Sequence, residues 1–280
     1  MEEEEKQSSG ARRRWLVDAA RWRPSPAQFQ AAASLLPPHE RTAITRFVRE
    51  DDRKRALVSR LLQYSLVHHV LGIPLHQIRI NRTLEGKPYL QNKNGTFPGF
   101  NFNTSHQGNY VGIASEPLCL VGLDIACISK PQGETALEFI KNFASHLTYH
   151  EWNCIVSSGS PDEMLAEFYR YWCLKEAFVK ATGVGVGFGL QRLEFHHTNW
   201  TDIFLSIDGE EVRKWRFWLF KIDEMYMASI ARGHPEDAID SFKRTLSDVV
   251  VQEEELQGAL DIPEEAFTIW TVEQLLRLHD

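Results

Sequence analysis

Cysteine is scarce in this chain of 280 residues, which contains only four, and no two of them form a Cys-x-x-Cys pair. Zinc ribbons, thioredoxin-like redox motifs and disulfide scaffolds all need closely spaced cysteines. The sequence therefore predicts neither a structural zinc site nor a disulfide framework. It predicts reduced thiols in a reducing compartment, and we expect a cytoplasmic location.

Long apolar runs are absent as well. No segment approaches the roughly 18 consecutive apolar residues that a membrane span needs, and Met1 is followed by four glutamates instead of an apolar leader. We therefore expect no membrane partner. The arginines at positions 12–14 leave a mitochondrial location as the alternative.

Positive charge is in deficit, with a formal net charge of −7 from 38 Asp and Glu against 31 Lys and Arg. A general nucleic-acid binder usually has the opposite balance, so we expect no nucleic-acid partner. The segment 41–60 is rich in arginine, however, and is compatible with a local anion site.

The pattern of apolar residues predicts an α+β fold. Helical periodicity covers 26–36, 40–71, 134–145 and 161–182, with a further helix beginning at 148. Strand patterns cover 14–23, 77–82, 100–106, 110–114, 120–125, 190–195, 203–207, 212–220 and 226–230. Both halves of the chain have a helical block followed by strands. We therefore predict a pseudo-twofold pair of similar α/β subdomains, which favours a monomer.

This layout predicts the domain organisation. A disordered N-terminus (1–13) precedes an N-terminal half (14–117) and a C-terminal half (118–232). The remaining residues, 233–280, form an acidic tail that is loose to about 258. A candidate docking strand at 267–270 and a short helix at 272–278 follow.

The helix at 161–182 has the clearest local signals. It begins with Ser160-Pro161-Asp162-Glu163, a capping box with proline at the first helical position, and Gly183 ends it. Within it, Glu176 and Lys180 lie one turn apart on a partly apolar face. They are either an exposed ion pair, which stabilises a helix by only about 0.3–0.5 kcal/mol, or a ligand and a phosphate contact.

Asp124 lies within the apolar strand 120–125. An acid in such a strand has to be paired, neutral or bound to a metal. The alternative is that Asp124 caps a neighbouring loop.

Two further stretches place polar groups at strand ends. Residues 100–106 begin as a strand and then become fully polar at Asn103, Ser105 and His106, a placement often associated with function. At 82–89, Arg82 and Lys87 flank a glycine turn and either present cations to a phosphate or form a simple charged turn.

Two other patterns are rejected. The glycine-rich segment 183–189 closes a helix and precedes a strand, whereas a dinucleotide-binding loop follows a strand and opens a helix. It is instead a connector or a substrate-facing loop. His146 and His150 resemble a metal-binding pair, but a helix cap at Thr148 places His146 outside the helix.

Four stretches together resemble the 4′-phosphopantetheinyl transferase superfamily, in its larger, broad-specificity Sfp type. Gly122-Leu123-Asp124-Ile125 resembles the G-(I/V)-D motif, and Trp172-Cys-Leu-Lys-Glu-Ala-Phe-Val-Lys180 resembles W-x-x-K-E-(A/S)-x-x-K. Residues 102–106 resemble F-N-x-S-H, and 82–88 resemble a basic G-K-P element. The resemblance spans about residues 14–232.

The resemblance implies an activity. Such enzymes move the 4′-phosphopantetheine group of coenzyme A to a serine of an apo carrier protein and release adenosine 3′,5′-bisphosphate, with Mg²⁺. By this resemblance Asp124 and Glu176 bind Mg²⁺, and Glu176 also helps to remove the serine proton. Lys180 contacts the phosphates and assists the leaving group, and His106 hydrogen-bonds a phosphate oxygen.

The resemblance also assigns a coenzyme A pocket. Its members come from the hairpin, the polar strand end and the helix: Arg82, Gly86, Lys87, Asn103, Thr104, Ser105, His106, Lys175 and Lys180, with Arg41 or Arg55 on the 3′-phosphate.

One position departs from the pattern. Many relatives of this type carry a second acid two residues after the motif aspartate, and here that position is Ala126. This leaves two alternatives open: a non-catalytic protein that binds coenzyme A or a carrier, and a hydrolase of phosphoanhydrides that uses the same metal and Lys180.

Overall fold

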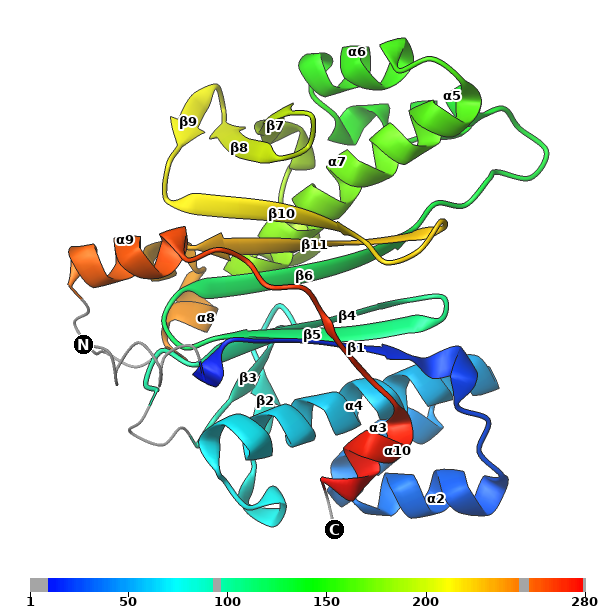
Figure 1. Ribbon diagram of the computed structural model, residues 1–280, viewed down its shortest axis with the longest axis vertical. Helices are drawn as coiled ribbons and strands as arrows, with labels where there is room; N and C mark the ends of the chain where they lie inside the picture. The colour runs from blue at the N-terminus through cyan, green and yellow to red at the C-terminus, as the bar shows by residue number, and fades with distance from the viewer. Residues whose placement is uncertain (1–9, 93–96, 247–251, 279–280) are drawn as a thin grey trace.

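The computed structural model describes residues 10–92, 97–246 and 252–278, and two sheets lie between two long helices in it (Figure 1). In the N-terminal half, α4 (Glu50–Leu71) covers the sheet β12-β1-β5-β4. In the C-terminal half, α7 (Pro161–Thr182) covers the sheet β10-β11-β6. Both helices have 22 residues. The α+β class is confirmed, and the two halves share this layout. Among the described residues, no helix has the length and apolar character needed to span a bilayer.

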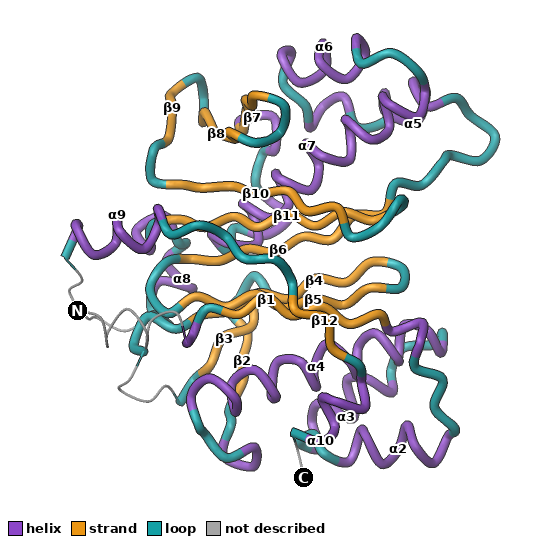
Figure 2. Tube along the Cα trace, viewed as in Figure 1, coloured by secondary structure: helices purple, strands orange, loops and turns teal. Residues whose placement is uncertain are grey.

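The remaining elements follow in chain order, as the tube view also shows (Figure 2). The N-terminal half contains β1 (Arg13–Asp18), α2 (Pro26–Ser34), α3 (Pro38–Thr45), β2 (Ile80–Arg82), β3 (Pro88–Leu90), β4 (Asn101–Gln107) and β5 (Tyr110–Glu116). The C-terminal half contains β6 (Leu120–Cys127), α5 (Ala136–Lys141), α6 (Tyr149–Ser157), β7 (Leu193–Thr198), β8 (Asp202–Ile207), β9 (Glu210–Val212), β10 (Trp215–Lys221) and β11 (Tyr226–Gly233). The last segment contains α8 (Asp240–Lys243), α9 (Glu253–Asp261), β12 (Thr268–Trp270) and α10 (Val272–Arg277).

The single helix predicted at 40–71 is wrong, because the chain forms α3 and then α4. Arg49 is extended, with φ −79° and ψ 136°, and three acids fill the first turn of α4. Acidic side chains stabilise a helix N-terminus through the helix dipole, so this sequence starts a new helix at Glu50. Pro38 is the first residue of α3, since proline is tolerated at the first helical position.

The tail is packed, which corrects the predicted loose segment at 233–258. The Phe242 side chain is buried, and Leu256, Ala259 and Leu260 of α9 form a cluster with Leu118 and Cys119. Positions 247–251 of that segment lie outside the described residues. The strand predicted at 267–270 and the helix predicted at 272–278 are confirmed as β12 and α10. β12 pairs parallel with β1, so the chain ends against the N-terminal half (Figure 1).

The predicted disordered N-terminus is partly wrong. Residues 1–9 lie outside the described residues, but Ala11 and Arg12 are buried. Arg12 belongs to a cluster of side chains no more than 3% exposed, in which three arginines surround two glutamates. Glu116 pairs with Arg12 at 3.0 Å, Arg14 at 2.5 Å and Arg232 at 3.1 Å, and Glu264 pairs with Arg14 and Arg232, both at 2.6 Å. This Arg–Glu cluster connects β1, β5, β11 and the tail.

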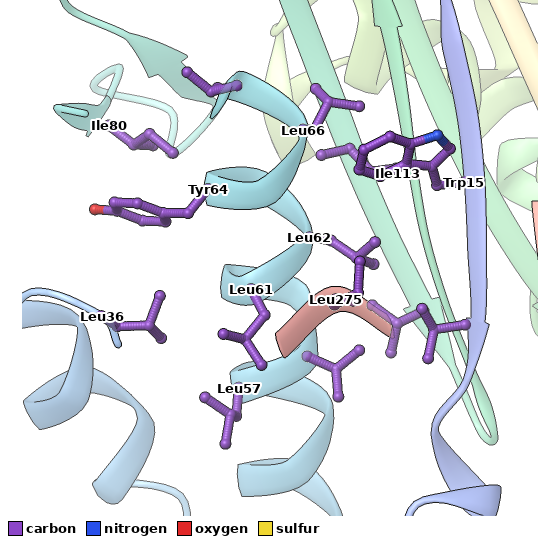
Figure 3. Packing of buried hydrophobic residues seen from close by; sticks show 14 of the residues in the cluster. Trp15, Leu36, Leu57, Leu61, Leu62, Tyr64, Leu66, Ile80, Ile113 and Leu275 are labelled. Carbon is purple, nitrogen blue, oxygen red and sulfur yellow. The ribbon is translucent and has the colours of Figure 1, made fainter. Parts of the chain in front are cut away.

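The N-terminal core explains the placement of α4. Leu57, Leu61 and Leu62 are fully buried between the sheet and the neighbouring helices, close to Leu275 of α10 (Figure 3). Burying side chains of this size stabilises the fold by roughly 1.5–3 kcal/mol each. The tail therefore supplies part of the core of the half to which it returns.

Candidate active site

Side chains of β4 bind the main chain of β6, where the two halves meet. The side-chain oxygens of Asn101, Asn103 and Ser105 accept hydrogen bonds from the N–H groups of Val121, Leu123 and Ile125 at 3.1, 2.9 and 3.1 Å. The spacing of two follows from the alternation of side chains along a strand. Asn101, Asn103 and Ser105 therefore satisfy the N–H groups along one edge of β6. The sequence did not predict this role.

Asp124 of β6 lies between the two halves and is paired. The residue is only 7% exposed. Its Oδ1 accepts hydrogen bonds from Lys180 Nζ at 2.6 Å and from Ser105 Oγ at 3.2 Å. Burial disfavours the charge of Lys180, but Asp124 outweighs this effect and raises the pKa of Lys180. Lys180 is therefore a cation held at the join of α7 with β4 and β6.

Glu176 lies one turn before Lys180 on α7. Burial and the charge of Asp124 raise the pKa of Glu176, while Lys180 and His146 act in the opposite direction. The negative charges of Asp124 on β6 and Glu176 on α7 therefore repel each other. A bound cation would relieve this repulsion.

The oxygen atoms of Asp124 and Glu176 suit Mg²⁺. Mg²⁺ prefers oxygen ligands and is often held by one or two carboxylates together with substrate phosphates and water. Asp124 and Glu176 fit that donor set. Ala126 packs against Cys173 and Met227, and the described residues contain no group of three His, Cys, Asp or Glu placed to hold a metal. With two carboxylates, the remaining positions around Mg²⁺ would be filled by water and substrate oxygens.

A cavity of about 510 Å³ is lined by Glu176 and Lys180. Asp124 and Ser105 are not among the residues that line it, but both contact Lys180. The hairpin, β4 and α7 each contribute predicted site residues to its lining: Arg82, Gly86, Lys87, Asn103, Thr104, Glu176 and Lys180. A volume of this size is typical of small-molecule and cofactor sites. The structure thus brings most of the predicted pocket together from three separate parts of the chain.

Lys175 is not part of this cavity, and its predicted phosphate contact is wrong. Its Nζ is fully buried, pairs with Glu151 at 2.8 Å and donates hydrogen bonds to the carbonyls of Leu190 and Leu193. Successive residues of a helix point about 100° apart, so Lys175 faces β7 while Glu176 faces the cavity. Lys175 instead fastens α7 to α6 and β7.

The two arginines assigned to the 3′-phosphate are not in the cavity lining either. Arg41 Nε donates a hydrogen bond to the Leu36 carbonyl at 2.7 Å. Arg55 pairs with Asp52 at 2.5 Å and donates to the Gly108 carbonyl at 3.0 Å. Arg41 is therefore bound to local main chain through Nε, and Arg55 to main chain and to a helix neighbour.

His106 lies on β4 outside the residues that line the cavity. Desolvation and the positive charges of Arg55 and Lys180 lower its pKa. Its imidazole is therefore mainly neutral at pH 7, with one ring N–H available as a donor. Its position near Lys180 is compatible with the predicted phosphate contact.

Sequence reasoning missed an aromatic and apolar wall of the cavity. Trp172, Val179, Phe188, Leu190 and His146 line it, and the His146 ring lies 6.0 Å from the Trp172 ring in an edge-on arrangement. His146 had been considered only as a metal ligand. The spacing of Trp172, one turn before Glu176, was the available signal. Gly183, Gly185 and Phe188 confirm that the glycine-rich segment faces the cavity.

The Lys87 side chain is engaged with main chain, unlike the free cation predicted at the hairpin tip. Its Nζ donates hydrogen bonds to the carbonyls of Lys180 and, at 3.4 Å, Val121, and the residue is only 7% exposed. Burial and the nearby charge of Lys180 lower the pKa of Lys87 to about 7.

This lowered pKa predicts a pH-dependent stability. Between about pH 7 and the ordinary lysine value of 10.5, the unfolded chain binds one proton more than the folded chain at this position. The free energy of unfolding therefore gains up to about 1.4 kcal/mol per pH unit there, and below pH 7 the cost of burying the ammonium is fully present. Urea unfolding of wild type and Lys87→Met, from about pH 7 to about pH 9, measures this contribution. We expect the wild-type value to rise relative to the variant, and parallel pH profiles would contradict the assignment.

Two family models and several known proteins are similar to this chain. A family model described as "4'-phosphopantetheinyl transferase, N-terminal" matches residues 20–118, and one described as "4'-phosphopantetheinyl transferase superfamily" matches residues 120–231. A Rattus norvegicus protein named L-aminoadipate-semialdehyde dehydrogenase-phosphopantetheinyl transferase is 39% identical over 232 residues, covering 80% of this chain and 75% of its own. A Thraustochytrium phosphopantetheinyl transferase is 34% identical, covering 79% and 78%. The solved holo-ACP-synthase of Plasmodium yoelii is 13% identical over 41% of this chain and 94% of its own, with a TM-score of 0.33.

Proposed function

The chain belongs to the 4′-phosphopantetheinyl transferase superfamily, and from this membership we propose how its cavity performs the transfer. The membership confirms the resemblance identified from the four sequence motifs. The protein is a transferase that moves phosphopantetheine from coenzyme A to a carrier protein. The proposal is that the reaction needs Mg²⁺, releases adenosine 3′,5′-bisphosphate and takes place between α7, β4 and β6.

One observation carries the proposal: Glu176 and Lys180 of α7 line one cavity, and Asp124 of β6 is bound to Lys180. Asp124 and Glu176 would hold the metal through carboxylate oxygens. When bound, Mg²⁺ supplies positive charge that neutralises the pyrophosphate of coenzyme A. Positioning and charge neutralisation contribute most of the acceleration in phosphoryl transfer.

The chain's own groups handle the proton and the leaving group. The serine oxygen of the carrier forms a bond to the β-phosphorus, and the phosphoanhydride bond to adenosine 3′,5′-bisphosphate breaks. Glu176 accepts the serine proton, directly or through one water molecule. Lys180, which is held charged by Asp124, stabilises the negative charge on the departing phosphate.

The ends of coenzyme A are assigned by charge and shape. Arg82, an exposed residue of the hairpin, and Gly86, at φ +91°, would bind the nucleotide end with Thr104 of β4. His106 would donate its ring N–H to a phosphate oxygen. The apolar wall at Trp172 and Phe188 suits the uncharged pantetheine arm.

Intact-mass spectrometry of an apo acyl carrier protein tests the transfer. After incubation with the protein, coenzyme A and Mg²⁺, we expect the carrier to gain the mass of one phosphopantetheine, because the reaction joins that group to the carrier serine. EDTA should prevent the gain. A gain that persists in EDTA would contradict the metal requirement. Release of adenosine 3′,5′-bisphosphate without a carrier would favour the hydrolase, and coenzyme A binding without either reaction would favour the non-catalytic binder.

We further propose that the protein acts as a monomer in the cytoplasm, with mitochondria as the alternative. The similar halves already bring both sides of the site together within one chain. Cys119, Cys127, Cys154 and Cys173 carry free thiols, which are compatible with a reducing compartment.

A further inference from the structure

The contacts of the Lys87 side chain differ from those expected of a lysine that binds phosphate. Its ammonium lies over the Phe242 ring at 4.5 Å from the centroid, and it donates hydrogen bonds to the carbonyls of Lys180 and Val121. Its stem passes the glycine that ends α7, where a Cβ at Gly183 would lie 3.3 Å from Lys87 Cδ. The side chain is thus enclosed by α7, β6 and α8.

The two carbonyls belong to the elements that carry the reactive groups. Lys180 is in the last turn of α7, where carbonyls have no partner within the helix. A lysine donor satisfies such a carbonyl and interacts favourably with the negative end of the helix dipole. Val121 lies in β6, three residues before Asp124.

The main chain of Lys87 belongs to the hairpin. Its N–H donates to Thr83 Oγ1 at 3.3 Å and its carbonyl accepts from Thr83 N–H at 2.9 Å, which closes the turn that contains Gly86. Arg82 donates to the Gly86 carbonyl at 2.8 Å in the same turn. One residue therefore links the hairpin side of the cavity to the two elements that hold Asp124, Glu176 and Lys180.

We propose that Lys87 is a positioning residue, which holds the hairpin in register with α7 and β6 and does not bind the coenzyme's phosphates. This inference rests on the proposed transferase mechanism of the same cavity. Loss of the link would leave the coenzyme bound by the hairpin but misaligned with Asp124 and Lys180. Misplacement by about 1 Å is enough to slow an enzymatic reaction by roughly 10²-fold.

Steady-state kinetics of Lys87→Met with saturating apo carrier, compared with Arg82→Met, separates positioning from phosphate binding. For Lys87→Met we expect kcat to fall by about 10- to 100-fold with KM for coenzyme A changed by less than about 3-fold. For Arg82→Met we expect mainly a higher KM, because Arg82 lines the cavity at the proposed nucleotide end.

A second substrate sharpens the test. With 3′-dephospho-coenzyme A, a positioning role predicts the same fold-loss for Lys87→Met as with coenzyme A. A loss that disappears on this substrate, a loss confined to KM, or unchanged kinetics would each overturn the proposal. Because each result is a ratio to wild type, an inactive wild type would instead refute the proposed function.

Phe242→Leu provides an independent variant if Lys87→Met does not fold. Phe242 lies outside the cavity lining and its ring supports the ammonium of Lys87. We expect a smaller fall in kcat, again without a change in KM. A kcat equal to that of wild type would count against the proposal.

Discussion

Glu176→Gln is expected to abolish phosphopantetheine transfer while the fold survives. The amide has the shape of the carboxylate but cannot accept the serine proton, and it leaves Asp124 as the single anionic metal ligand from the chain. A general base alone typically contributes 10²- to 10⁴-fold, so we expect the rate to fall by about 10³-fold or more. The rate of mass gain on an apo carrier protein measures the loss.

Glu176→Gln should be at least as stable as wild type, although its activity is lost. Burial and Asp124 raise the pKa of Glu176, so the folded protein holds this charge unfavourably in the absence of a cation. The neutral amide removes that repulsion, and the midpoint of thermal unfolding should be equal to or above that of wild type. A lower midpoint would assign the lost activity to unfolding.

Asp162→Asn is the matched control on the same helix. Asp162 pairs with Lys130, and both side chains are mostly exposed. Exposed pairs contribute little, so the rate should stay at the wild-type value. The midpoint should fall only slightly, because Asp162 also lies in the first turn of α7 and interacts with the helix dipole. If Glu176→Gln keeps more than about a tenth of the wild-type rate, Glu176 is neither a required ligand nor the base.

The second large effect is on stability: Glu116→Gln should lower the free energy of unfolding by about 3–5 kcal/mol. The variant would leave Arg12, Arg14 and Arg232 with Glu264 as the remaining carboxylate of the Arg–Glu cluster. All of these side chains are no more than 3% exposed, so water cannot replace the lost partner. Urea unfolding at pH 7 measures the loss.

The cluster also predicts acid sensitivity. Burial alone would raise the pKa of Glu116, but Arg14, Arg232 and Arg12 outweigh burial and lower it. The stabilisation is therefore present above the ordinary glutamate value and is lost as the pH falls through the lowered folded-state value. The difference between wild type and Glu116→Gln should shrink in acid.

An exposed ion pair supplies the comparison for Glu116. Glu224 pairs with Lys221 at 2.6 Å, with side chains 89% and 66% exposed. Glu224→Gln should leave the urea midpoint unchanged, because solvent screens such pairs. Equal effects of the Glu116 and Glu224 variants would contradict a structural role for the cluster.

Local signals in the sequence were enough for the main elements of the site. α7 begins and ends where predicted, because a capping box, a proline and a left-handed glycine act on their immediate neighbours. Asp124 was predicted to need a partner because an acid in an apolar strand cannot remain alone, and its partner is Lys180. Their spacing of four residues also placed Glu176 and Lys180 on one face of that helix.

Tertiary structure alone decided which cations face the cavity. Lys175 and Arg55 lie outside the cavity lining and are bound to carboxylates and carbonyls. Lys87 lines the cavity, but its ammonium is bound to carbonyls of α7 and β6. α7 is covered by protein on several sides, so its periodicity identifies faces without saying which one meets the substrate. The partners of Lys87 and Glu116 lie about 30 to 120 residues away in the chain. Contacts of that range depend on how the two halves and the tail pack, which no local pattern encodes.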